Sequence, residues 1–173
     1  MKFKKMFTVV SRKLLGEYRW ALKQGLKVGT GFSTMGGGSS SFGAEPYLIT
    51  IGNNVRLSYN VDFVTHDGGT WAFRREKGRE DIVRFGKITV GDDTFIGAHA
   101  TIMPGVNIGK NCVIGIGSIV TTDIPDRCVA AGIPAKVICS TDEYADKCRK
   151  KMPVNWNESE YKKNKKEYLL KIL

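Results

Sequence analysis

Histidine and closely spaced cysteines are scarce in this chain of 173 residues, and their scarcity excludes several kinds of site. The four cysteines lie between residues 112 and 148, and no C-x-x-C pair occurs. With only two histidines beside them, the usual zinc patterns cannot be drawn. We therefore expect no metal, and we expect free thiols in a reducing cytoplasm.

Long apolar runs are also missing. No stretch approaches the roughly 20 apolar residues of a membrane-spanning helix. Lys4, Lys5, Arg12 and Lys13 interrupt the N-terminus before an apolar run reaches the length of a signal peptide. The sequence therefore predicts a soluble, cytoplasmic protein.

Positive charge exceeds negative charge, with a formal net charge of +10. The excess lies at the ends: residues 1–27 hold eight Lys or Arg against one Glu, and residues 141–173 hold nine against six acidic residues. Residues 88–138 are close to neutral. A nucleic-acid-binding protein would carry a basic stripe with interleaved aromatics along its main body. That pattern is absent, so we expect no nucleic-acid partner, whereas an anionic substrate or surface remains compatible with the charge.

An aliphatic residue recurs at every sixth position through the middle of the chain. A helix would require a spacing near 3.6 and an ordinary strand a spacing of 2, so this pattern predicts short strands with a bend every six residues. The positions are Val90, Ile96, Ile102, Ile108, Ile114 and Val120, preceded in the same register by Ile51, Leu57 and Phe63.

Glycines that follow the aliphatic positions reveal a second, longer period. Gly91 and Gly109 stand three hexads apart, as do Gly97 and Gly115. Three hexads therefore make one coil with three flat sides, and successive coils stack at strand spacing. The fold class is an all-β solenoid, a parallel β-helix of triangular cross-section. The glycines are expected at corners that need a positive φ or a close approach of two backbones.

The β-helix is expected to occupy residues 29–140. Its register is interrupted once, and residues 67–87 are predicted to form a long loop extruded after His66. Excursions of this length in a compact repeat are usually functional or disordered. The Gly- and Ser-rich residues 29–43 fit the hexad poorly, and either irregular first coils or a flexible connection would account for them.

Helices are expected at both ends. Residues 1–28 are predicted to form an N-terminal region with a basic amphipathic helix over residues 2–27. We prefer the interpretation that this helix caps the open end of the solenoid, with contact to a membrane surface as the alternative. Residues 141–173 are predicted to form a helical tail, in which Met152-Pro153 separates a helix over residues 141–151 from a helix over residues 158–172.

Several segments resemble a known family. The run from Ile88-Thr-Val-Gly-Asp-Asp-Thr-Phe-Ile-Gly onward resembles the hexapeptide-repeat acyltransferases of the left-handed β-helix superfamily. The ending Val129-Ala-Ala-Gly-Ile-Pro-Ala-Lys is similar to the galactoside, maltose and xenobiotic acetyltransferase branch. Glu45-Pro-Tyr-Leu-Ile and Phe63-Val-Thr-His-Asp-Gly-Gly resemble acetyltransferases of capsule and lipopolysaccharide synthesis. The resemblance covers roughly residues 45–138.

The resemblance implies a left-handed coil, whereas the general crossover rule alone would favour a right-handed one. It also implies a homotrimer with active sites between neighbouring prisms and acetyl-coenzyme A lying along the coils. The expected activity is an acetyl-coenzyme A-dependent O-acetyltransferase that acts on a sugar hydroxyl in surface-polysaccharide biosynthesis. Because the N-terminus is basic, residues 1–27 are a candidate for peripheral contact with the inner face of the membrane.

Acetyl transfer to a hydroxyl needs a base that accepts the hydroxyl proton, and imidazole suits this role at cellular pH. His66 lies where the register breaks and matches the family's catalytic histidine in sequence context, so we take it as the general base of a direct transfer. His99 lies inside a hexad, where a packing or inter-subunit role is expected. The carboxylates that would orient His66 or bind the acceptor are Asp67, Glu80 and Asp81.

The resemblance also implies the contacts to acetyl-coenzyme A. It places an oxyanion-stabilising backbone N–H at Ala98 and further contacts at Ile116, Thr121, Thr122 and Lys136. The family often has a lysine where Thr122 stands, so one phosphate contact is missing there. Lys136 remains available for the nucleotide phosphates.

Three alternatives use the same scaffold. The first is an N-acetyltransferase for an amino sugar or for an antibiotic such as a streptogramin or chloramphenicol. The second is a zinc carbonic anhydrase, which is hard to build from two histidines as far apart in the chain as His66 and His99. The third is a non-catalytic scaffold, which would retain the hexads without needing His66 or Lys136.

Overall fold

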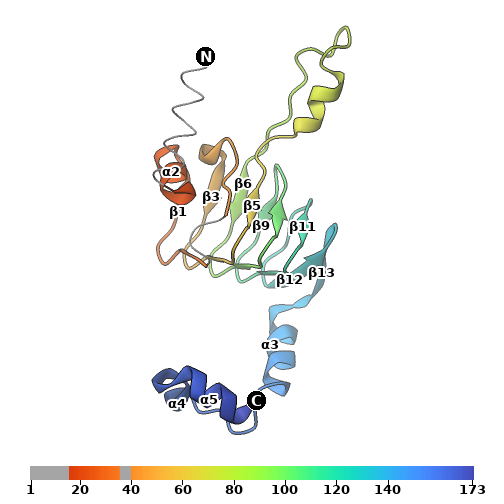
Figure 1. The fold of residues 1–173 in the computed structure, drawn as a ribbon. Coiled ribbons are helices and arrows are strands. Elements are labelled where there is room, and N and C mark those ends of the chain that lie inside the picture. Colours follow the sequence, from red (N-terminus) through yellow and green to blue (C-terminus); the bar gives the residue numbers. More distant parts are fainter. Residues whose placement is uncertain (1–15, 36–39) are drawn as a thin grey trace. The chain divides into compact units, whose positions relative to one another are not determined.

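Very short strands make up most of the chain in the computed structural model, which describes residues 16–35 and 40–173. The chain divides into two units, residues 1–141 and residues 142–173. In the first unit, coils follow one another from helix α2 (Glu17–Lys23) to a terminal hairpin (Figure 1). The strands are β1 (Lys27–Val28), β2 (Ser33–Thr34), β3 (Ile49–Ile51), β4 (Arg56–Leu57), β5 (Asp62–Phe63), β6 (Ile88–Val90), β7 (Phe95–Ile96), β8 (Thr101–Ile102), β9 (Asn107–Ile108), β10 (Val113–Ile114), β11 (Ile119–Val120), β12 (Cys128–Gly132) and β13 (Ala135–Ser140).

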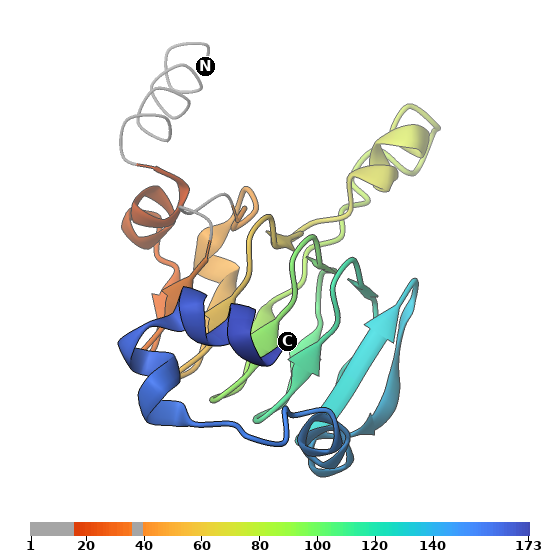
Figure 2. The ribbon, with the colours of Figure 1, turned by 60° about the horizontal axis from the view of Figure 1, so that its bottom comes forward.

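The strands form three sheets, one for each side of the coil. Their orders are β1-β3-β6-β9, β13-β12-β10-β7-β4-β2 and β11-β8-β5, and all pairs are parallel except β12 with β13. Partners in adjacent coils, such as Thr89 and Asn107, are 18 residues apart. This register confirms the predicted coil with three flat sides. Figure 2 shows the same stack after a rotation, from the orange β1 to the cyan β12 and β13.

The aliphatic hexad positions line the interior of the coils, as predicted. Each is the last residue of its strand, and the nine side chains are at most 3% exposed. Because successive residues of a strand point to opposite faces, the residue before each ladder position faces outward. Burying one large aliphatic side chain contributes roughly 1.5–3 kcal/mol, so the ladders contribute a large share of the stability of this unit.

Two kinds of residue make the corners. A Cβ on Gly91 would lie 2.6 Å from the carbonyl carbon of Gly109, so close backbone approach explains this glycine. Positive φ occurs two residues later, at Asp93 (φ 56°), His99 (φ 58°) and Asn111 (φ 52°). Asn and Asp adopt this conformation more readily than most residues. His99 therefore occupies the same corner position as Asp93 and Asn111, and its role there is structural.

The long interruption leaves the stacking register intact. Across it Leu57 pairs with Ile96, and Asn53 donates to Asp92, a residue 39 positions later instead of 18. The intervening segment contributes no strand to the three sheets among the described residues, and it contains a 3-10 helix, η2 (Gly68–Phe73). In both views this yellow to yellow-green segment runs away from the coils (Figures 1 and 2).

The first coil is irregular but belongs to the solenoid. β2 pairs in parallel with β4, so residues 33–34 of the Gly- and Ser-rich segment form part of a sheet. Residues 36–39 of that segment lie outside the described residues. A second short 3-10 helix, η1 (Pro46–Leu48), leads into β3.

The predicted N-terminal helix ends earlier than expected. Most of residues 2–27 lie outside the described residues, and α2 ends at Lys23. Gly25 then adopts a φ of 98° and residues 27–28 enter β1, so the helical boundary at residue 27 was wrong. Trp20 and Ala21 on α2 are buried in the same core as the ladders. The described part of the helix therefore covers apolar side chains at the first coil.

The second unit is a small helical assembly. The helices are α3 (Thr141–Lys150), α4 (Glu158–Lys163) and α5 (Lys165–Ile172). A single helix over residues 158–172 was expected, but Asn164 breaks it with a φ of −149° and caps α5 by accepting a hydrogen bond from Glu167 N. Trp156, Tyr161 and Tyr168 form the aromatic cluster that holds α4 and α5 together.

A pair of isoleucines two residues apart tests the ladders. Ile114 is fully buried whereas Ile116 is 71% exposed. We expect Ile114→Ala to lower the free energy of unfolding by about 2–5 kcal/mol, because it leaves a cavity between stacked coils. Ile116→Ala is the matched control and should change it by no more than about 0.5 kcal/mol. Chemical denaturation at one fixed protein concentration measures both values, and equal losses would contradict the assignment of the ladder.

Candidate active site

His66 lies just beyond the carboxyl end of β5, where the chain leaves the coils. An antiparallel bridge to Phe85 joins the outgoing and returning limbs of the long segment at this point. The side chain of His66 is 44% exposed, and its Nδ1 lies 3.0 Å from Glu45 Oε2. An ionised carboxylate only accepts hydrogen bonds, so Nδ1–H donates to Glu45 and the lone pair is left on Nε2. The geometry therefore suits a base that acts through Nε2.

Glu45 was missing from the residues proposed from the sequence. It lies just before η1, its side chain is mostly buried, and it also accepts a hydrogen bond from the hydroxyl of Thr65. The coil register places it there: Ser41 bridges to Asp62, 21 positions later, and the same offset brings Glu45 beside His66. This offset belongs to the irregular first coil and does not follow from the hexad spacing, so the sequence carried no direct signal for Glu45.

The three carboxylates expected to orient His66 or to bind the acceptor make no hydrogen bond to the imidazole among the described residues. Asp67 Oδ1 accepts a hydrogen bond from Gly69 N at the start of η2, and its other oxygen lies 3.6 Å from Arg84 Nη1. Glu80 and Asp81 are exposed in the long segment. Within residues 16–35 and 40–173, the carboxylate at hydrogen-bond distance from the imidazole is that of Glu45. The adjacent Asp67 instead organises the loop.

The residues expected to contact coenzyme A separate into two groups on opposite edges of the sheet β11-β8-β5. Thr121 and Thr122 follow β11 and lie at the carboxyl edge, as His66 does. Ala98 precedes β8 and Ile116 precedes β11, so both lie at the amino edge. Because the three strands are parallel, the two groups are at opposite ends of one face of the prism.

Lys136 belongs to the amino-edge group. It pairs with Ala131 across the β12–β13 hairpin, and a Cβ added to Gly115 would lie 2.7 Å from the Cβ of Ala131. The hairpin therefore lies against the coil just before Ile116. The side chains of Ile116 and Lys136 are both exposed, and the backbone N–H of Ala98 has no acceptor among the described residues. This edge offers an apolar surface, a cation and a free backbone donor.

An open groove of about 280 Å³ runs beside His66. Its lining includes residues 62–66, which form and follow β5, and the polar residues among its neighbours are Ser41 and Thr101. The groove is open to solvent next to the imidazole, as a base that acts on an incoming hydroxyl requires.

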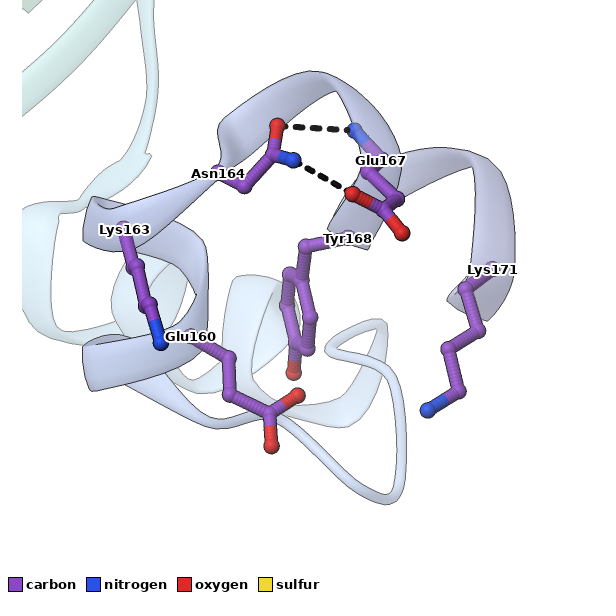
Figure 3. Close-up of a pocket in the computed structure, with 6 residues that line it drawn as sticks. All are labelled: Glu160, Lys163, Asn164, Glu167, Tyr168 and Lys171. Carbon is purple, nitrogen blue, oxygen red and sulfur yellow. Dashed lines mark hydrogen bonds between the residues drawn. The ribbon is translucent and has the colours of Figure 1, made fainter.

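A second hollow of about 280 Å³ lies between α4 and α5 in the other unit (Figure 3). Its Tyr168 hydroxyl already donates to Asn155 O, and Asn164 and Glu167 bond to each other. Its acidic and basic side chains come in similar numbers and no histidine is present, so it offers no base for acyl transfer. The lining residues are Glu160, Lys163, Asn164, Glu167, Tyr168 and Lys171.

The described residues offer neither a metal site nor a membrane span. In residues 16–35 and 40–173 no group of three His, Cys, Asp or Glu side chains is placed to bind a metal ion. No helix in the same ranges is long and apolar enough to cross a membrane. Burial raises the pKa of the Cys112 thiol, which keeps this residue protonated and a poor nucleophile.

Comparison with known sequences identifies relatives along the whole chain. Residues 87–122 match a family model described as the hexapeptide repeat of succinyl-transferase. Protein CapG of Staphylococcus aureus is 41% identical over 171 residues, which are 96% of this chain and 94% of that protein. The galactoside O-acetyltransferase of Escherichia coli K12 is 45% identical over 94 residues, 54% of this chain and 45% of that protein.

Comparison with solved structures gives the same fold. A maltose O-acetyltransferase from Clostridium difficile 630 aligns with a TM-score of 0.56 over 78% of this chain and 84% of that chain. The two sequences are 24% identical. At this identity the likeness establishes the shared architecture of the coils and no more.

The Glu45 contact can be tested by the tautomer of His66. We expect Nδ1–H to predominate in the wild-type protein, and Glu45→Ala to return the ring toward the Nε2–H form that free histidine prefers, because the acceptor at Nδ1 is lost. Nitrogen-15 NMR above pH 8, where imidazole is neutral, distinguishes the two forms. Glu45→Gln retains an acceptor and serves as the control, and His99 is an internal reference. An Nε2–H form in the wild type would rule the contact out.

Proposed function

The chain belongs to the hexapeptide-repeat acetyltransferases, and we propose that it transfers the acetyl group of acetyl-coenzyme A to a sugar hydroxyl during synthesis of a surface polysaccharide. One observation carries the assignment of the site: the imidazole of His66 is held at Nδ1 by Glu45, and His66 lines an open groove. Among relatives, the galactoside O-acetyltransferase supports a sugar acceptor. Membership in this family implies the left-handed path of the coil.

In the proposed reaction, acetyl-coenzyme A supplies an activated acetyl group as its thioester. His66 Nε2 accepts the proton of the acceptor hydroxyl as its oxygen attacks the acetyl carbon. Glu45 holds the ring in the tautomer that leaves Nε2 unprotonated, and it stabilises the imidazolium that forms. His66 then returns the proton to the departing thiolate, so the histidine is regenerated with no covalent enzyme intermediate.

The amino-edge group fits coenzyme A by its chemistry. Lys136 supplies an exposed cation for phosphate, and Ile116 supplies exposed apolar surface for the pantetheine arm. The N–H of Ala98, which has no acceptor among the described residues, would stabilise the oxyanion that develops on the acetyl oxygen. Thr121 and Thr122, on the other edge, would add hydroxyl donors.

The separation of the site residues between the carboxyl edge and the amino edge supports a homotrimer with shared sites. His66 and Ala98 lie at opposite edges of the sheet β11-β8-β5, and Lys136 lies on the β12–β13 hairpin beside the amino edge, so a single prism does not bring them to one point. Neighbouring prisms around a threefold axis would place the carboxyl edge of one copy beside the amino edge of the next. Each site would then take its base from one subunit and coenzyme contacts from its neighbour.

We propose a cytoplasmic location for the protein. The described residues contain no membrane-spanning helix. Contact of residues 1–27 with the inner membrane face stays a prediction, because residues 1–15 lie outside the described part. A lipid-linked acceptor would give such contact a purpose.

The two histidines provide a matched test of the base. We expect His66→Ala to lower acetyl transfer by roughly 10²- to 10⁴-fold, because the group that accepts the hydroxyl proton is lost. His99→Ala should retain most of the activity. Release of coenzyme A, followed with a thiol reagent across a panel of sugars and nucleotide sugars, measures both. Coenzyme A binding should survive in both variants, and near-normal turnover by His66→Ala would falsify the mechanism.

Subunit mixing tests the shared site. Ile116→Asp with Lys136→Glu should abolish coenzyme A binding at the amino edge, because it adds negative charge where phosphates are expected. Co-refolding this variant with His66→Ala should recover up to about a quarter of the wild-type sites, since some neighbours then combine two intact edges. Light scattering checks that the mixed species are trimers. No recovery in mixed trimers would show that each site lies within one subunit.

A further inference from the structure

A row of polar side chains crosses the sheet β11-β8-β5 beside the imidazole. Ser41 bridges to Asp62, and Asp62 pairs with Thr101, so the three residues stand side by side in register. Since Phe63 and Ile102 point into the core, their predecessors Asp62 and Thr101 face outward. Neighbouring strands are about 4.8 Å apart, so the row spans about 10 Å. That length matches one sugar ring with its hydroxyls.

The carboxylate at the centre of this row lacks a partner. Among the described residues, no hydrogen bond or ion pair holds the exposed Asp62 side chain. The hydroxyls of Ser41 and Thr101 flank it in the groove. An open carboxylate between two hydroxyls is an arrangement of acceptors and donors that suits a ligand with several adjacent hydroxyl groups.

An aromatic ring borders the base on the loop side. The centroid of Phe85 lies 5.7 Å from that of His66, and 56% of Phe85 is exposed. Two backbone hydrogen bonds fix this position: Asp67 N donates to Arg84 O at 2.9 Å, and Gly86 N donates to Thr65 O at 3.0 Å. The ring is therefore an apolar surface rigidly placed next to the base.

From these contacts we propose that Phe85 and Asp62 form the acceptor subsite and that it selects a neutral pyranose ring. Phe85 packs against the C–H face of the sugar. Asp62 accepts hydrogen bonds from sugar hydroxyls on the side of the ring opposite to the hydroxyl that reacts at His66. The negative charge of Asp62 disfavours sugars that carry a carboxylate at this position. This inference rests on the proposed function, because it takes the bound sugar to be the acceptor of the acetyl group. The binding of the sugar can be tested without acetyl transfer.

Saturation-transfer difference NMR on the full chain tests the subsite without turnover. The probes are methyl β-D-galactopyranoside, methyl β-D-glucopyranoside and galacturonic acid. We expect at least one neutral glycoside to bind, and galacturonic acid to bind more weakly. Phe85→Leu should weaken binding about two- to tenfold through the loss of ring stacking. Phe95→Leu, which alters an exposed ring on β7, is the matched control and should leave binding unchanged.

A second variant isolates the charge. Asp62→Asn should narrow the difference between galacturonic acid and the neutral glycosides, because the repulsion is removed while the size is kept. Any of three results would overturn the subsite. In the first, the wild type fails to bind the glycosides; in the second, Phe85→Leu binds them with unchanged affinity; in the third, light scattering shows that Phe85→Leu assembles differently. His66→Ala should still bind the glycoside. If the wild type binds it but transfers no acetyl group to it, the proposed function fails and the subsite stands.

Discussion

Stacking of equal coils in register is the constraint on which this protein depends. Each side of a coil presents inward apolar residues, and these reach low energy only when the next coil places its own residues directly above them. The corners obey the same constraint, because Gly91 leaves room for the backbone of Gly109 one coil later. Where the chain departs from the repeat, it returns in register: Leu57 still stacks on Ile96 after the long interruption.

The candidate site arises from this constraint at the point where the repeat is interrupted. His66 leaves the coil beside residues that are still held in it, so an exposed imidazole is fixed by a rigid neighbour, Glu45. The returning limb closes the other side through the bridge to Phe85. A mobile loop alone would not hold these groups, since backbone hydrogen bonds between the outgoing and returning limbs determine their positions.

The period of six and its threefold multiple made the ladders, the coil and the location of His66 predictable, because stacking follows directly from spacing. Glu45 was not predictable in the same way. Its place depends on the longer offset of the irregular first coil, which the hexads do not reveal. The break at Asn164 was missed because the helical pattern continues across it and only the cap distinguishes two helices from one. Asp67 was considered for its adjacency to His66, but its side chain caps the start of η2 instead.

Leu57 and Ile96 stack as direct neighbours although they are far apart in the sequence. This arrangement affects how enzymes with this fold can diversify. The entropy of closing a loop grows only with the logarithm of its length, so doubling the insertion costs about 0.6 kcal/mol. Coils on either side feel no change in their own packing. The segment that would face the acceptor can therefore gain, lose or exchange residues while the edge that would hold the coenzyme stays as it is. Selection for a new acceptor would act on one insertion and leave the folding of the scaffold untouched.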